Sequence, residues 1–252
     1  MKECIIKTEK ICKSFVTDGE VNNVIKNMDL ELYQEDFTVI MGNSGSGKST
    51  LLYLLSGMDK VTSGEVYLKE KNITNCKENE MASIRQDNIG FVFQGMNLIP
   101  DLTVRENVMS PTYRKKKARK DWSGRVNELL LQMGMQSHEN KFPSQLSGGQ
   151  RQRTAICRAL MNEPELIFAD EPTGALNSGT GEMVLDLFTQ LYNEGQSIVM
   201  VTHDLKAAVR GNRVVFLRDG RIDGELMLGN FMKEEEKDRE KVLFEFLKER
   251  GW

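Results

Sequence analysis

The chain has 252 residues, of which 39% are hydrophobic and 28% charged, so it can bury the core of one large domain with or without an inserted lobe. Its formal net charge of −3 gives no reason to expect a nucleic-acid partner, and no segment approaches the ~20 apolar residues that would span a bilayer. The first 15 residues lack the apolar segment and cleavage site of a signal peptide. We therefore expect a cytoplasmic protein whose four scattered cysteines are free or buried thiols.

Two segments near the N-terminus, residues 5–15 and 24–32, alternate polar and apolar side chains. A period of two indicates β-strands with one buried face, and Asp18-Gly19-Glu20 between them is typical of a turn. We predict an antiparallel pair. Phe15, close to the end of the first strand, is either a core aromatic or a residue that contacts a ligand.

The next feature is a glycine-rich loop between an apolar strand at residues 37–41 and an apolar helical run at residues 51–55. The loop fits G-x-x-x-x-G-K-S, in which glycines let backbone N–H groups converge on phosphates, Lys48 supplies a cation and the Ser49 hydroxyl can ligate Mg²⁺. A glycine turn without a ligand would leave the Lys-Ser pair unexplained. We predict that a nucleotide with Mg²⁺ binds at Gly42, Asn43, Ser44, Gly45, Ser46, Gly47, Lys48, Ser49 and Thr50.

Further strands are predicted at residues 65–68 and 89–93, and the second of them ends at Gln94. From there to about residue 160 helical patterns dominate, which indicates an inserted helical lobe. Thr103 and Glu106 have the spacing of a capping box, and residues 126–133 present an apolar helix face. The basic run at residues 114–120 is either a solvated helix face or a contact for anionic lipid or a membrane partner.

A second candidate anion site follows at residues 147–150, where Ser147 can cap a helix and two glycines leave the first backbone N–H groups bare. A plain helix start is the alternative interpretation. Beyond it, apolar strands at residues 166–169 and 197–201 alternate with a helix at residues 181–191, which favours a parallel sheet covered on both faces.

Polar side chains follow several of these strands, where open α/β sheets bind ligands. We assign Ser49, Asp170 and Gln94 to Mg²⁺, with Gln94 able to contact the attacking water instead. Glu171 is the candidate general base, and His203 can donate to the γ-phosphate. The predicted reaction is hydrolysis of the nucleotide.

The motifs together resemble those of ATP-binding-cassette (ABC) ATPases, up to about residue 224. The most specific of them is L-S-G-G-Q at residues 146–150. The resemblance implies a P-loop core with a mainly parallel sheet, an N-terminal antiparallel β subdomain and a helical subdomain at about 95–160. It also implies that two copies pair head to tail, so that Ser147, Gly148, Gly149 and Gln150 of one copy face the ATP held by Lys48 of the other.

The same resemblance implies that Phe15 stacks on adenine and that a loop with Ala175, Leu176 and Asn177 crosses the dimer. An aspartate is usual where Asn177 stands, so the strength of coupling across the dimer is in question. Residues 225–252 form a separate tail, predicted to be an amphipathic helix with Val242, Leu243, Phe246 and Leu247 on one stripe, packed on the domain or across a dimer.

Within the family, the chain is similar to the subgroup that serves macrolide efflux, lipoprotein release and antimicrobial-peptide resistance, and its tail is similar to those of the bacitracin-resistance-like branch. This implies an ATPase that powers a separate membrane permease at the inner face of the membrane, with Met96, Leu98 and Ile99 partly exposed toward it or packed within the lobe. A signalling or cell-wall-regulating membrane complex is the alternative. DNA repair would call for a heptad insertion or a basic surface, and neither is visible.

Overall fold

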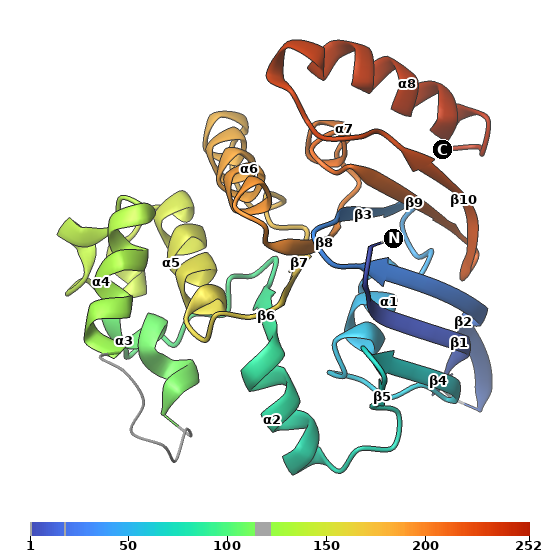
Figure 1. Cartoon of the computed structure of the whole chain (residues 1–252), viewed down its shortest axis with the longest axis horizontal. Helices are drawn as coiled ribbons and strands as arrows, with labels where there is room; N and C mark the ends of the chain where they lie inside the picture. Colours follow the sequence, from blue (N-terminus) through green and yellow to red (C-terminus); the bar gives the residue numbers. More distant parts are fainter. Residues whose placement is uncertain (1, 18, 114–121) are drawn as a thin grey trace.

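The fold is built on two β-sheets that enclose one helix (Figure 1). The structure is a computed structural model, and it describes residues 2–17, 19–113 and 122–252. The smaller sheet has the order β2-β1-β4-β5 and is antiparallel, so the predicted N-terminal strand pair is confirmed. Its strands are β1 (Cys4–Thr17), β2 (Glu20–Tyr33), β4 (Ser63–Leu68) and β5 (Lys71–Asn72).

The larger sheet has the order β10-β9-β3-β8-β7-β6. Every neighbouring pair in it is parallel except β9 with β10. Its strands are β3 (Phe37–Gly42), β6 (Ile89–Val92), β7 (Leu166–Asp170), β8 (Ser197–Val201), β9 (Arg213–Arg218) and β10 (Arg221–Met227). The mainly parallel sheet is thus confirmed. The hairpin β9–β10 was not predicted. The predicted boundary at residue 224, between the ATPase domain and the C-terminal tail, falls inside β10.

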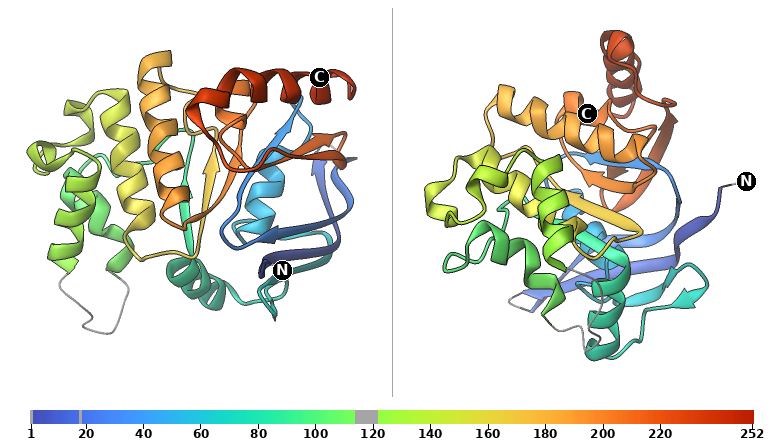
Figure 2. Two further views of the ribbon diagram at one scale, coloured as in Figure 1. Left: turned by 45° about the horizontal axis from the view of Figure 1, so that its top comes forward. Right: turned by 60° about the vertical axis from the view of Figure 1, so that its left-hand side comes forward.

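Both faces of the larger sheet are buried because side chains alternate between two apolar clusters. On β3, Val39 points to one cluster and Ile40 to the other. The cluster of Ile40 fills the space between the two sheets and includes α1 (Lys48–Leu55). On the opposite face lie α6 (Ser178–Asn193), α7 (Leu205–Ala208) and α8 (Glu236–Lys248), as Figure 2 shows.

A helical lobe projects from one edge of the molecule (Figure 1). It contains α3 (Val104–Met109), α4 (Trp122–Gln132) and α5 (Gly148–Leu160), and the predicted capping box of Thr103 and Glu106 begins α3. The basic run at residues 114–120 lies outside the described residues. The helix α2 (Glu78–Asn88) comes before the lobe, and the sequence analysis did not predict it. Short 3₁₀ helices lie at Ser110–Thr112, Gln136–His138, Pro143–Gln145 and Lys233–Glu235.

The segment after β6 divides between the two expected alternatives, exposure toward a partner and packing within the lobe. Met96 is buried, with 8% of its surface exposed, which fits packing within the lobe, whereas Ile99 is 44% exposed. The physical reason lies in α5: Arg158 donates to the backbone carbonyls of Met96 and Asn97 and draws the segment against the lobe.

The C-terminal helix α8 packs on its own domain. Leu243 and Leu247 are fully buried in the main core, and Phe246 packs against it. Val242 is 49% exposed, which corrects its predicted place on the apolar stripe, because it lies at the edge of the stripe centred on Leu243. Arg239, one turn before Leu243, is buried on this stripe and donates to five backbone carbonyls, those of Val209, Gly211, Leu228, Gly229 and Asn230.

All four cysteines are free thiols, as predicted. Cys157 is completely buried on α5, and burial raises its pKa to about 12, so this thiol is unreactive. None of the helices in the described part of the chain has the length and apolar character needed to cross a membrane.

Candidate nucleotide site

The predicted site residues meet at one edge of the larger sheet. β3, β8, β7 and β6 are consecutive and parallel, so their carboxyl ends lie side by side. These ends carry, in the same order, the glycine-rich loop, His203, the pair Asp170 and Glu171, and Gln94. The convergence expected from the sequence is therefore present, and it follows from strand order alone.

The glycine-rich loop has a conformation that requires glycine at two places. Gly45 and Gly47 lie in the left-handed region with φ of 78° and 98°, and a Cβ on Gly47 would come within 2.9 Å of Ile25 Cδ1. Gly47 is the N-cap of α1, so the loop ends at the positive end of that helix. The backbone N–H groups at this point are thus arranged for a phosphate.

Lys48 lies inside the loop and braces it. Its Nζ donates to the carbonyls of Gly42, at 2.8 Å, and Asn43, at 2.9 Å. Burial lowers the pKa of Lys48, while the carboxylates of Glu171 and Asp170 act in the opposite direction. An ammonium group has three donors, so one remains for a phosphate oxygen while the other two hold the loop.

Ser49 and Asp170 form the expected metal-ligand pair. Ser49 Oγ lies 2.9 Å from Asp170 Oδ1, and the hydroxyl of Tyr53 donates to Asp170 Oδ2 at 3.1 Å. Burial raises the pKa of Asp170, and these two hydrogen bonds oppose the shift. Tyr53 was not predicted, although its position four residues after Ser49 on α1 places both on one helix face.

This donor set fits Mg²⁺. A hydroxyl and a carboxylate are both oxygen ligands, and Mg²⁺ usually takes one or two protein ligands together with phosphate oxygens and waters. Within residues 2–17, 19–113 and 122–252, no group of three or more His, Cys, Asp or Glu side chains could hold a metal by itself. A metal at Ser49 and Asp170 therefore depends on the nucleotide for its remaining ligands.

Glu171 is held by the two other polar strand ends. His203 Nδ1 lies 2.9 Å from Glu171 Oε1, and Gln94 Nε2 donates to Oε2 at 3.1 Å. Glu171 itself has a left-handed φ of 42°, and its N–H donates to the Val201 carbonyl of β8. A carboxylate can only accept, so an ionised Glu171 requires that Nδ1 of His203 carries a proton. A neutral His203 ring then has a bare Nε2. Such a ring can donate to a phosphate only after protonation or a change of partner.

The second candidate anion site is the start of α5. Ser147 caps the helix, and a complete capping box joins it to Gln150: Gln150 N donates to Ser147 Oγ at 3.3 Å, and Ser147 N donates to Gln150 Oε1 at 2.9 Å. Gly149 has to be glycine, since a Cβ there would lie 2.2 Å from Thr180 Cγ2 of α6. Across the described residues, no hydrogen bond connects this helix start to the glycine-rich loop, and Figure 1 places α5 in the lobe, away from α1.

The predicted dimer loop lies beside the start of α5. Leu176 packs against the main core, and a Cβ on Gly148 would lie 3.2 Å from its Cδ2. Ala175 is exposed, and Asn177 is the N-cap of α6, because its Oδ1 accepts from Thr180 N at 2.9 Å. Asparagine and aspartate cap helices about equally well, so the replacement leaves the local structure intact.

Phe15 is exposed to 41%, which excludes the core interpretation. The ammonium of Lys13 lies 4.9 Å from its ring centroid. Lys13 pairs across the sheet with Ile25, and Ile25 with Val24 lies against Gly47 of the phosphate loop. The phenyl ring of Phe15 is therefore solvent-accessible on the part of the small sheet that adjoins this loop.

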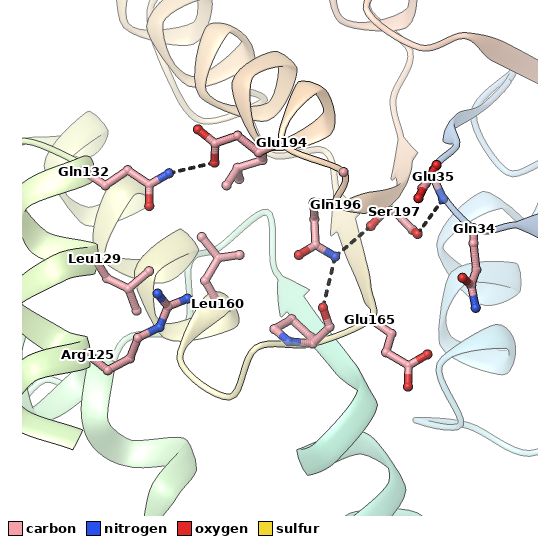
Figure 3. A pocket seen from close by; sticks show the side chains of 13 residues that line it. Gln34, Glu35, Arg125, Leu129, Gln132, Leu160, Glu165, Glu194, Gln196 and Ser197 are labelled. Atoms are coloured by element: carbon pink, nitrogen blue, oxygen red, sulfur yellow. Dashed lines mark hydrogen bonds between the residues drawn. The ribbon is translucent and has the colours of Figure 1, made fainter. Parts of the chain in front are cut away.

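A cavity of about 420 Å³ opens at the opposite edge of the larger sheet, between α4 and the amino ends of β7 and β8 (Figure 3). Two pairs of its polar lining groups are hydrogen-bonded: Gln132 Nε2 donates to Glu194 Oε2 at 3.1 Å, and Gln196 Nε2 donates to the Pro164 carbonyl at 3.1 Å. None of the predicted site residues lines this cavity. The cavity therefore lies apart from the predicted nucleotide-site residues at the carboxyl ends of the strands.

Comparison with known proteins agrees with this geometry. The family model described as ABC transporter matches residues 25–174. An uncharacterized ABC transporter ATP-binding protein of Methanocaldococcus jannaschii is 43% identical over 232 residues, which cover 90% of this chain and 99% of that protein. A dimeric structure of that cassette in a post-hydrolysis state, bound to ADP and Pi, has a TM-score of 0.83 at 41% identity and is matched over 90% of this chain and 100% of its own.

Two relatives carry the names of export systems. A macrolide export ATP-binding/permease protein of Mannheimia succiniciproducens is 41% identical over 218 residues, 86% of this chain but 34% of that protein. A bacitracin export ATP-binding protein of Halalkalibacterium halodurans is 40% identical over 227 residues, which cover 90% of each chain. The chain therefore belongs to the ABC transporter family and is one of its ATP-hydrolysing subunits.

Proposed function

We propose that two copies of this chain pair head to tail around ATP and Mg²⁺ and that their hydrolysis cycle drives a separate membrane permease. The observation that carries the proposal is the position of the α5 start. Ser147 is exposed, capped and remote from the chain's own phosphate loop. The solved relative with ADP and Pi is a dimer, in keeping with a site completed by a second copy.

In the proposed site the phosphates bind to Lys48 and the loop N–H groups, while Ser49, Asp170 and Gln94 hold Mg²⁺. The metal supplies neutralisation of charge on the phosphate oxygens. Glu171 accepts a proton from the attacking water, and its carboxylate is oriented for this by Gln94 and His203. Both orienting groups come from neighbouring strand ends, so the base is fixed before the nucleotide binds.

Across the dimer, the backbone N–H groups of Gly148 and Gly149 face the γ-phosphate of the other copy, together with Ser147 and Gln150. Ser147 Oγ accepts a hydrogen bond from Gln150 N and so keeps its own proton for donation. Phe15 stacks on the adenine, which its exposed ring permits. The loop with Ala175, Leu176 and Asn177 lies at the junction, where Asn177 contributes hydrogen bonds without charge.

The lobe is suited to pass movement between the site and a permease. The Arg158 guanidinium on α5 donates to the carbonyl oxygens of Met96, at 2.7 Å, and Asn97, at 2.5 Å, and these residues follow Gln94 closely in the chain. Asn107 holds the next part of the segment, since its amide exchanges hydrogen bonds with both backbone groups of Ile99. The exposed Ile99 then offers an apolar contact for a membrane partner, which would place the protein at the inner face of the membrane.

The proposed cargo is an antimicrobial peptide or similar amphiphile, by analogy with the relatives named for bacitracin and macrolide export. A signalling or cell-wall-regulating complex is the alternative for the same ATPase. The partner distinguishes them, because both use the same nucleotide chemistry.

The test is affinity capture of tagged Glu171→Gln chain from detergent-solubilised membranes, with and without ATP. We expect an integral membrane protein to co-purify, with more of it retained when ATP holds the dimer together. A Lys48→Ala chain is the matched control for nucleotide dependence. Recovery of no membrane-spanning protein in either state would contradict the coupling to a permease.

A further inference from the structure

His138 lies against the signature residue Gln150. It ends the 3₁₀ turn Gln136–His138, and its ring bridges two side chains: Nε2 is 2.9 Å from Gln150 Nε2, and Nδ1 is 3.0 Å from Ser137 Oγ. The ring is only partly exposed. Gln150 is also half of the capping box that begins α5, so His138 contacts the helix start through one intervening side chain.

The hydrogen bonds fix the protonation of this ring. Ser147 N can only donate, so the group 2.9 Å from it must be the amide oxygen of Gln150. The amide nitrogen of Gln150 therefore faces His138 as a donor, and Nε2 of the imidazole must accept. A neutral ring then carries its proton on Nδ1, where Ser137 Oγ accepts it.

We propose that His138 is a positioning residue for the trans ATP contact, and that only its neutral, Nδ1-protonated ring holds Gln150 in the capping box. A protonated ring presents N–H to the Gln150 NH₂ group. Gln150 must then turn its amide oxygen toward His138, which sets its NH₂ group against Ser147 N and breaks the box. Protonation of His138 thus excludes the hydrogen bond from Ser147 N to Gln150 Oε1, while Ser147 Oγ still accepts from Gln150 N.

The charged neighbours of the ring act in one direction. Lys141, on the adjoining turn, and Arg153, on α5, both lower the pKa of His138, and burial lowers it most. Glu139, the nearest carboxylate in sequence, is paired with Arg105 at 2.8 Å. The pKa therefore lies below its ordinary value of 6.5, so the neutral ring and the capped helix start are retained at neutral pH.

The same shift gives the sign of the pH effect on folding. The unfolded chain takes up this proton at a higher pH than the folded chain does, so the contribution of His138 to stability is intact above about pH 6.5 and falls as the pH drops below it. Acidification below about pH 6.5 should consequently weaken the hydrogen bond from Ser147 N to Gln150 Oε1.

The ring state can be read directly, because the chain has only two histidines. Imidazole ¹⁵N spectra of the His203→Ala chain at pH 7.5 report His138 alone. We expect Nδ1 to carry the proton and Nε2 to be bare. A ring protonated on Nε2, or equal populations of the two tautomers, would overturn the assignment. This readout does not depend on dimer formation.

A second experiment measures the effect of His138 on dimer formation, and it rests on the proposed pairing of two copies. It uses the Glu171→Gln chain, in which ATP is not hydrolysed during the measurement. The ATP-dependent dimer dissociation constant is compared at pH 7.5 and 5.5 for this chain and for a His138→Gln version, whose amide oxygen accepts without titrating. We expect roughly threefold to tenfold weaker dimers at the lower pH only when His138 is present. His138→Ala should be weak at both values.

The outcomes separate the two proposals. Equal pH dependence in the chains with His138 and with Gln at this position overturns the role of His138. Absence of ATP-dependent dimers at every pH contradicts the paired site instead, and the ¹⁵N spectra then still decide whether His138 holds Gln150.

Discussion

The two parts of the proposed ATP site are built differently. At the strand ends, the side chains form two adjacent sets of hydrogen bonds: Ser49 and Tyr53 of α1 with Asp170, and Gln94 and His203 with Glu171. At the α5 start, Ser147 and Gln150 satisfy each other, and their further link is to His138. The sheet thus fixes the side chains of the first part around a ligand bound to the same chain. The second part has its hydrogen bonds satisfied within the lobe and is exposed to a second copy.

This difference predicts that substitutions in the two parts affect different steps of the ATP cycle. Changes at the strand ends should act on binding or turnover in a single chain. Changes at the α5 start should leave nucleotide affinity alone and act only on pairing. The predictions below separate these effects.

The largest expected effect comes from Glu171→Gln. The amide retains the shape that Gln94 and His203 hold but cannot accept a proton from water, so turnover should fall by about 10²–10⁴-fold while ATP binding is kept. Phosphate release measures the first and calorimetry the second. With ATP the variant should sediment as a dimer, and one that stays monomeric would refute the head-to-tail arrangement.

Lys48→Ala comes next. It removes a cation that contacts phosphate and also the brace on the Gly42 and Asn43 carbonyls. Loss of a charge-assisted hydrogen bond is worth about 1.5–3 kcal/mol, so the dissociation constant for ATP should rise about 10- to 150-fold. Lys206→Ala, on the exposed N-terminal turn of α7, is a control for charge. Unchanged ATP binding would remove Lys48 from the phosphate site.

Phe15→Ala should have a smaller and selective effect. Stacking of a base on an aromatic ring is worth about 1–3 kcal/mol, and at the lower end of that range ATP affinity should fall by about fivefold to tenfold while inorganic triphosphate affinity stays the same. Val16→Ala, with the neighbouring and more exposed side chain, is the control. Equal losses for both ligands would mean that Phe15 acts on the fold of the β1–β2 pair and not on adenine.

Asn177→Asp is the smallest change. Both residues cap α6, so the melting temperature should hardly move, and a shift of more than about 0.5 kcal/mol in unfolding free energy would contradict the cap. The added charge lies beside the proposed junction, and its effect should be confined to the dissociation constant of the ATP-bound Glu171→Gln dimer. Equilibrium unfolding and sedimentation measure the two quantities.

Most of the strand-end site follows from the sequence, because motifs at the ends of parallel strands meet whatever lies between them. Other features depend on contacts between distant segments. Met96 is buried since Arg158, 62 residues later, holds its carbonyl. The helix α2 escaped prediction because it buries only Met81 and Ile84 among polar residues, which leaves a faint periodicity.

The hairpin β9–β10 could have been found from the apolar run at residues 214–217 followed by Asp219-Gly220. The link between His138 and Gln150 could not, because a 3₁₀ turn and a helix start at different points of the lobe bring the two side chains together. Sequence spacing locates groups on one element well, and it says little about which turns face each other.

The composite nature of the site can be tested by mixing two defective chains. In the Glu171→Gln background, one chain carries Lys48→Ala and the other Ser147→Asp, which still caps α5 but sets a carboxylate against the γ-phosphate of its partner. Ser144→Asp, exposed three residues earlier, is the control for charge. Native mass spectrometry with ATP should show heterodimers holding one ATP in the mixture, because one intact pair of half-sites remains, and little or no dimer from either chain alone. If the mixture forms no heterodimer, or if the Ser147→Asp chain pairs by itself as well as its parent, the two half-sites do not belong to one ATP.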